Sequence, residues 1–146
     1  MIPKIIHYCW LGDSEFPELV KKCIQSWKKK MPDWEFILWD KNCLKDLNSD
    51  WVNEAYSTKK YAFAADYIRL YAVNKFGGFY LDSDVEVLKN FAPLLDSPYI
   101  FALENEIGDI EAATFGSEPN NPYVQKCLSY YEGRHFIKKD NTYDTF

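Results

Sequence analysis

Two aspartates separated by a single serine, Asp82 and Asp84, are the residues of this chain best suited to hold a divalent cation. Carboxylate oxygens are the hard ligands that Mg2+ and Mn2+ prefer. The pair directly follows three large apolar residues, 79–81, which have the pattern of a short buried strand after the glycines at 77–78. The same spacing fits a solvated turn in which Asp82 caps backbone amides. A cation site and a plain turn are therefore both open from this stretch alone.

A second pair of charged residues, Asp66 and Arg69, lies three positions apart in the alanine-rich stretch 61–76. In a helix this spacing places them on neighbouring positions of one face. They can form an ordinary ion pair there, which contributes little to stability. They can also hold a polyol, because a carboxylate accepts from hydroxyls and a guanidinium donates in a fixed fork.

A tryptophan, Trp10, is predicted at the exit of the first strand, beside Gly12. It is either a core residue or a flat platform on which a nucleobase stacks. His7, in the same strand, is interpreted as a hydrogen-bonded core histidine and not as a catalytic one.

The elements that must position these residues alternate along the chain. Apolar periodicity and turn residues predict strands over 2–10, 34–39, 79–81, 99–103 and 110–115, and helices over 16–31, 49–56, 61–76 and 122–131. The opening strand, helix and strand form a βαβ unit, whose parallel sheet is expected to be covered on both faces. The polar tail from residue 138 onward is predicted to contain no closing element.

Composition excludes several classes of protein. The chain has 146 residues, enough for one domain. With a net charge of −5 and lysines only in short clusters, nucleic acid is not expected as a partner. We find no signal peptide and no apolar run of membrane-spanning length, and four cysteines without a Cys-x-x-Cys pair. Reduced thiols and a cytoplasmic location are therefore expected. The 18% of aromatic residues indicates either a ring-packed core or a cleft that stacks bases or sugars.

Three stretches together resemble a known family. Residues 2–12, Ile-Pro-Lys-Ile-Ile-His-Tyr-Cys-Trp-Leu-Gly, resemble the opening strand of the sugar transferases that contain the Asp-x-Asp motif. Residues 64–71 and 77–85 resemble that family's Ser-Asp-x-x-Arg helix followed by Gly-Gly-x-Tyr-x-Asp-x-Asp. The family includes capsular-polysaccharide transferases and yeast-type mannosyltransferases of glycosyltransferase family 32, and the large glucosylating toxins share the arrangement.

The resemblance implies a fold and an activity. The fold would be α/β of the Rossmann-like GT-A type, with a mostly parallel sheet, helices on both faces and one nucleotide-sugar-binding domain over 1–146. The activity would be retaining transfer of a hexose from UDP- or GDP-hexose to a saccharide or lipid-linked saccharide. It would serve surface polysaccharide synthesis, in the cytoplasm or at the inner face of the membrane.

The resemblance also implies roles for the site residues. Asp84 would coordinate Mn2+ or Mg2+ on the donor diphosphate, and Asp82 would contact the ribose or the metal. Asp66 and Arg69 would hold hydroxyls of the donor sugar and, with Asp84, form the catalytic set. Of the two aromatic residues in the site, Trp10 would stack on the base and Tyr80 would reach a donor phosphate.

Two departures from the family pattern accompany the resemblance. Ala65 stands where the family has serine, which implies one hydrogen bond fewer to the donor. Family members also continue well past residue 146, so the C-terminal part, with acceptor contacts, is expected to be missing.

Three other functions are kept as alternatives. A module that binds nucleotide-sugar without turnover would need the same residues. A phosphatase of the haloacid dehalogenase type would place its motif near the N-terminus and have threonine or valine where Glu86 stands. A nucleotidyltransferase would have a longer gap between glycines and acids.

Overall fold

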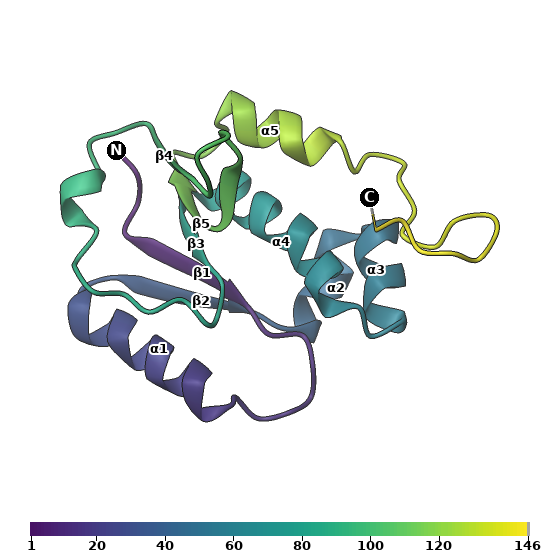
Figure 1. Cartoon of the computed structure of the whole chain (residues 1–146), viewed down its shortest axis with the longest axis horizontal. Helices are drawn as coiled ribbons and strands as arrows, with labels where there is room; N and C mark the ends of the chain where they lie inside the picture. Colours follow the sequence, from purple (N-terminus) through teal and green to yellow (C-terminus); the bar gives the residue numbers. More distant parts are fainter. Residues whose placement is uncertain (146) are drawn as a thin grey trace.

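Strands and helices alternate through the first half of the chain, and a hairpin and one helix follow (Figure 1). The computed structural model describes residues 1–145. The strands are β1 Ile5–Cys9, β2 Glu35–Trp39, β3 Gly78–Leu81, β4 Tyr99–Leu103 and β5 Ile110–Ser117. The helices are α1 Glu18–Lys30, α2 Leu44–Leu47, α3 Asp50–Ser57, α4 Tyr61–Phe76 and α5 Pro122–Ser129. Every predicted element is present in the predicted order, and α2 is a short helix that the sequence analysis did not predict. The expected domain 1–146 ends at Phe146, which lies outside the described residues.

The five strands form one sheet in the order β2-β1-β3-β5-β4, with β4 at one edge. Strand β1 pairs parallel with both β2 and β3, whereas β5 pairs antiparallel with β3 and β4. The sheet is therefore mixed, and the expectation of a mostly parallel sheet needs this correction. The reason is the connection between β4 and β5, whose six residues are enough for an antiparallel hairpin but too short for a parallel crossover. Strand β5 then lies between β4 and β3 and pairs antiparallel with both.

Helices cover both faces of the sheet, as expected (Figure 1). Each face has its own core. On one face α1 buries Trp27 against Ile6 and Phe79. On the other face α4 buries Ile68 near Tyr80, and α3 and α5 pack outside it. Alternation along β1 and β3 explains this division, since successive side chains of a strand point to opposite faces.

The direction of the chain reverses at β1. From β1 it crosses by α1 to β2 on one side, and later returns through α4 to β3 on the other side. Such a switch point leaves a crevice outside the carboxyl ends of the two strands, where α/β sheets bind ligands. The ends that meet here are Cys9 of β1 and Leu81 of β3.

The two glycines after α4 make its close return into β3 possible. Gly78 has φ +99°, and a Cβ on it would lie 2.7 Å from the carbonyl oxygen of Ile5. Gly77 has φ +67°, and its Cβ would meet Pro119 and Pro3. Only glycine fits such positions without strain, so this pair fixes how α4 meets β1.

The tail does contain a closing element, contrary to the prediction. Ile137 and Tyr143 form an antiparallel bridge, and Arg134 pairs with Asp144 at 2.7 Å. Phe136 is fully buried and stacks on Tyr143. This aromatic contact packs the otherwise polar tail against the rest of the fold. A single bridge has no apolar periodicity, which is why the sequence pattern did not reveal it.

Two further properties concern the chain as a whole. Over residues 1–145 no helix combines the length and the apolarity that crossing a membrane requires. All four cysteines are free thiols.

Candidate functional site

A hollow of about 590 Å3 lies at the switch point between β1 and β3. This volume falls within the range of about 300–1,000 Å3 that ligand pockets have. Its lining comes from the two strand exits, from the start of α1 with the loop before it, and from α4: Cys9, Trp10, Leu11, Gly12, Ser14, Pro17, Leu19, Val20, Tyr61, Ala62, Ala65, Arg69, Tyr80, Asp82, Ser83 and Asp84. The predicted residues Trp10, Tyr80, Asp82, Asp84 and Arg69 therefore meet in one place.

Helix α1 holds the acidic turn that follows β3. The indole N–H of Trp27 donates to the carbonyl of Val85 at 2.7 Å, and the backbone N–H of Val87 donates to the hydroxyl of Ser26 at 2.9 Å. Within the turn, the N–H of Val85 donates to the carbonyl of Asp82 at 3.0 Å. Asp84 is consequently presented to solvent on a fixed backbone, while Asp82 is half-buried.

Arg69 joins the helix pair to the acidic turn. Its Nη2 lies 3.2 Å from Oδ1 of Asp66 and 3.5 Å from Oδ1 of Asp82. Its Nη1 donates to the carbonyl of Ala112 at 2.7 Å and its Nε to that of Ala65 at 3.3 Å. Because most donors of the guanidinium are already engaged, Arg69 holds two carboxylates in place and has little capacity left for hydroxyls.

The two carboxylates that face Arg69 are less acidic than free aspartate. Burial raises the pKa of Asp66, and Arg69 only partly opposes this. Burial likewise raises the pKa of Asp82, against the opposing effects of Arg69 and of a hydrogen bond from Tyr80. Desolvation disfavours the anionic form of both groups, so a bound cation or hydroxyl donor would relieve that cost.

The aromatic residues of the site are fixed by their own contacts. The indole N–H of Trp10 donates to the carbonyl of Ser14 at 2.9 Å, and its ring packs edge-on against Phe16. Tyr80 is almost fully buried, with its ring 4.9 Å below the guanidinium of Arg69. Trp10 thus forms a half-buried wall of the hollow and Tyr80 forms its floor.

The acidic turn fits a cation that a ligand helps to bind. No cluster of three or more possible metal-ligating side chains exists among residues 1–145. Asp82 and Asp84 supply two carboxylates on one turn. Mg2+ is commonly held by one or two carboxylates together with substrate phosphates and water, so this donor set suits a cation that arrives with a diphosphate.

His7 lies outside the site, as predicted. It is fully buried, its Nδ1 accepts from the indole N–H of Trp39 at 3.1 Å, and its Nε2 lies 2.9 Å from the carbonyl of Gly77. Since Nδ1 accepts, Nε2 carries the proton and donates to Gly77. Burial lowers the pKa of His7 to about 4.

Sequence reasoning missed two contributors. Tyr61, at the start of α4, packs beside Gly12 in the hollow. The carbonyl of Ala112, in β5, accepts from Arg69. The contact from β5 had no local signal, because it depends on the antiparallel pairing of β5 with β3.

A family model describes most of this region. Residues 17–101 match the glycosyltransferase sugar-binding region containing the DXD motif. The chain belongs to this family. Its DXD motif is Asp82-Ser83-Asp84, at the exit of β3.

Curated relatives carry the DXD region within longer chains. Inositol phosphoceramide mannosyltransferase 1 of Schizosaccharomyces pombe is 27% identical over 94% of this chain and 46% of its own length. Inositol phosphoceramide mannosyltransferase 2 of the same yeast is 31% identical over 90% of this chain and 39% of its own length. Mannosyl phosphorylinositol ceramide synthase SUR1 of Saccharomyces cerevisiae is 29% identical over 94% of this chain and 37% of its own length. The chain spans less than half the length of these relatives.

A solved structure supports the fold. The PaToxG glycosyltransferase superposes with a TM-score of 0.73 at 21% identity, over 98% of this chain and 66% of that one. The predicted GT-A-like α/β fold of the DXD family is thereby confirmed.

Proposed function

We propose that this chain binds a nucleotide-sugar, UDP- or GDP-hexose, and transfers its hexose to an acceptor hydroxyl with the help of Mn2+ or Mg2+. The observation that carries the proposal is the bridge made by Arg69. One guanidinium nitrogen lies within 3.5 Å of Asp66 on α4 and of Asp82 in the DXD turn. Two motifs on different elements, the helix α4 and the turn after β3, therefore form one constellation at the sheet switch point.

Each of these residues would contact a different part of the donor. Trp10 borders the part of the hollow near Leu11 and Gly12 and would stack on the base. Asp82 would accept hydrogen bonds from ribose or hexose hydroxyls. Asp66 does not line this hollow, and Arg69 would keep both carboxylates in place. Tyr80 supports Arg69 from below and borders the path of the diphosphate.

Asp84 and Asp82 would hold the divalent ion, which when bound neutralises charge on the leaving diphosphate. The acceptor oxygen forms a bond to the anomeric carbon as the bond to the diphosphate oxygen breaks. The acceptor proton moves to the leaving diphosphate. Attack from the face of the leaving group would retain the configuration, and no carboxylate of the site needs to act as nucleophile.

The acceptor is proposed to be a saccharide or a lipid-linked saccharide. The names of the yeast relatives favour a lipid-linked acceptor and a mannosyl donor. A role in surface polysaccharide synthesis of the kind served by family 32 is the other proposal. The location that we propose is the cytoplasm or the inner membrane face.

A panel of nucleotide-sugars, each with and without Mn2+, tests the proposal by thermal shift and by donor hydrolysis. A matching donor at 100 times its Kd stabilises the fold by about 2.7 kcal/mol. We expect stabilisation by one donor only with the ion, and a loss of hydrolysis of about 100-fold, or about 2.7 kcal/mol, in Asp84→Asn. Asp96→Asn removes an exposed aspartate outside the hollow and is the matched control.

Other outcomes point to other functions. Donor binding that needs Mn2+ but gives no turnover indicates a binding module. Release of phosphate from small phosphoesters indicates a phosphatase. Transfer that is equal in wild type and Asp84→Asn would overturn the proposal.

A further inference from the structure

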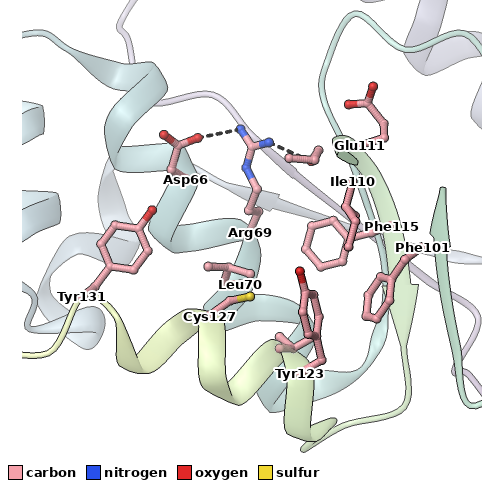
Figure 2. A pocket seen from close by; sticks show the side chains of 12 residues that line it. Asp66, Arg69, Leu70, Phe101, Ile110, Glu111, Phe115, Tyr123, Cys127 and Tyr131 are labelled. Carbon is pink, nitrogen blue, oxygen red and sulfur yellow. Dashed lines mark hydrogen bonds and ion pairs between the residues drawn. The ribbon is translucent and has the colours of Figure 1, made fainter. Parts of the chain in front are cut away.

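A second hollow, of about 260 Å3, lies beyond the Asp66–Arg69 pair, between α5 and the β4–β5 hairpin (Figure 2). Its lining is mainly aromatic and aliphatic: Asp66, Arg69, Leu70, Phe101, Ile110, Glu111, Ala112, Phe115, Tyr123, Val124, Cys127 and Tyr131. Figure 2 shows Arg69 on one side of this space, with Phe101, Phe115 and Tyr123 opposite. The volume is just below the range of about 300–1,000 Å3 that ligand pockets have, so it suits one ring-sized group.

This hollow adjoins the donor hollow at Arg69. Arg69 lines both of them, and Asp66 lines the second one. A group in the second hollow would therefore lie beside the donor hollow. The acceptor oxygen must come into contact with the anomeric carbon of the donor, so an acceptor site has to adjoin the donor hollow, as this one does at Arg69.

The charges around the second hollow disfavour anions. Its charged side chains are Asp66, Glu111 and Arg69, and no lysine lines it. Arg69 is shared between the carboxylates of Asp66 and Asp82. The carboxylate of Glu111 accepts from the N–H of Ala113. A phosphate placed here would meet two carboxylates and a cation that is already neutralised, which costs free energy.

We propose that this second hollow is the acceptor subsite and that it takes an uncharged, polyhydroxylated ring. The rings of Phe101 and Tyr123 would cover the apolar face of that ring, and Asp66 would accept from the hydroxyl that faces the donor. The inference rests on the proposed function for its role as an acceptor site. Its ligand class follows from the lining residues alone.

The test measures ring binding and transfer separately. Neutral probes are methyl α-D-mannopyranoside, methyl α-D-glucopyranoside and myo-inositol, and anionic probes are mannose 6-phosphate and glucose 6-phosphate. Saturation-transfer NMR gives their Kd for the whole chain, and mass spectrometry detects transfer from the donor found in the panel. We expect at least one neutral ring to bind at least about tenfold more tightly than its phosphate.

Variants locate the binding. Tyr123→Ala should weaken it about tenfold through the lost aromatic contact, while Tyr123→Phe retains it. Ile110→Ala should weaken it less. Leu103→Ala is the control, because Leu103 pairs with Ile110 across the hairpin but does not line the hollow. Glu111→Gln should reduce the discrimination against the phosphates.

The outcomes separate this inference from the proposed function. If the protein hydrolyses the donor but Tyr123→Ala leaves the acceptor KM unchanged, the acceptor subsite is wrong and the donor site stands. If a neutral ring binds in a way that depends on Tyr123 but no donor is hydrolysed, the ring-binding subsite stands and the proposed transferase function is wrong. Equal affinity for neutral and phosphorylated rings overturns the ligand class.

Discussion

A titratable side chain lies near each end of helix α4, His7 of β1 at one end and Asp66 of α4 itself at the other, and the two are in opposite states. At the C-terminal end, His7 is fully buried and both ring nitrogens have a protein partner, Trp39 and Gly77. In the N-terminal half, Asp66 keeps 41% of its side chain exposed, and its partner Arg69 is shared with Asp82. The His7 end, which we call the closed end, stabilises the fold. The Asp66 end, which we call the open end, keeps carboxylate oxygens available to a ligand.

The difference shows how a buried structural polar group can be distinguished from a ligand-binding one. A buried group that serves the fold has its hydrogen-bonding capacity met by the protein. At the open end, by contrast, the carboxylates of Asp66 and Asp82 are partly desolvated and one guanidinium serves both, so a ligand would complete their environment. Strongly shifted groups are found in both kinds of site, and the partners decide between them.

The largest effect is expected for Gly78→Ala at the closed end. The new Cβ would lie 2.7 Å from the carbonyl oxygen of Ile5 at a residue with φ +99°. Strain and overlap together should lower the free energy of unfolding by about 4 kcal/mol. Gly133→Ala, also at positive φ but with open space around its Cβ, should cost only about 1 kcal/mol. Urea unfolding measures both, and equal losses would show that packing at the helix end is loose.

The next effect is the acid sensitivity that His7 gives to the closed end. Its pKa is about 4 in the fold against 6.5 ordinarily, so the unfolded chain binds more protons between these values. Stability from this group is complete above pH 6.5 and should fall by about 3 kcal/mol as the pH drops to 4. Urea unfolding across this range should show the slope in the wild type and a much smaller one in His7→Gln. The same slope in the wild type and in His7→Gln would show that groups other than His7 cause it.

Trp39→Phe should have a smaller effect, about 2 kcal/mol, because it leaves Nδ1 of His7 buried without a donor. Trp10→Phe is its counterpart at the open end. There the indole N–H also donates to an acceptor, the carbonyl of Ser14, but water can replace it and about 0.5 kcal/mol should be lost. Thermal unfolding distinguishes the two, and equal changes would remove the contrast between the ends.

The smallest effect concerns titration at the open end. The carboxyl carbon signal of Asp82 should titrate with a pKa above that of free aspartate, because burial disfavours the anion. Mg2+ with UDP should lower that pKa, since a cation favours the ionised form. The response of Asp66 should be weaker, because it lies outside the acidic turn. NMR titration with and without Mg2+ and UDP tests this, and an unchanged Asp82 would place the ion elsewhere.

Most of the fold was predictable because its signals are local. The α4 boundaries Tyr61–Phe76 follow from an alanine-rich run that ends at glycine, and Ser49 caps α3 as predicted, by accepting from Val52. The antiparallel side of the sheet was not predictable in this way. The pairing of β5 with β3 depends on contacts between distant segments, and nothing near Ile110–Ser117 encodes it.

The donor side of the site was predictable for the same reason, and the second hollow was not. Asp66 and Arg69 share a helix face, and Asp82 and Asp84 share a turn, so their spacing alone brings each pair together. Phe101 lies in β4, whereas Tyr123 and Tyr131 lie in α5 and in the turn directly after it, and only the fold brings these two segments together. The high aromatic content indicated a stacking cleft as one of two interpretations, without indicating where.

Strand β4 has a consequence for the behaviour of the protein in concentrated solution. It lies at the edge of the sheet, and its sequence Tyr-Ile-Phe-Ala-Leu carries no charge, proline or glycine. Tyr99 is 52% exposed and Leu103 is 68% exposed. An uncharged edge strand of this kind is a template on which a second chain can add a strand. Self-association is therefore expected to begin at β4, and a lysine in place of Leu103 would oppose it without touching either hollow.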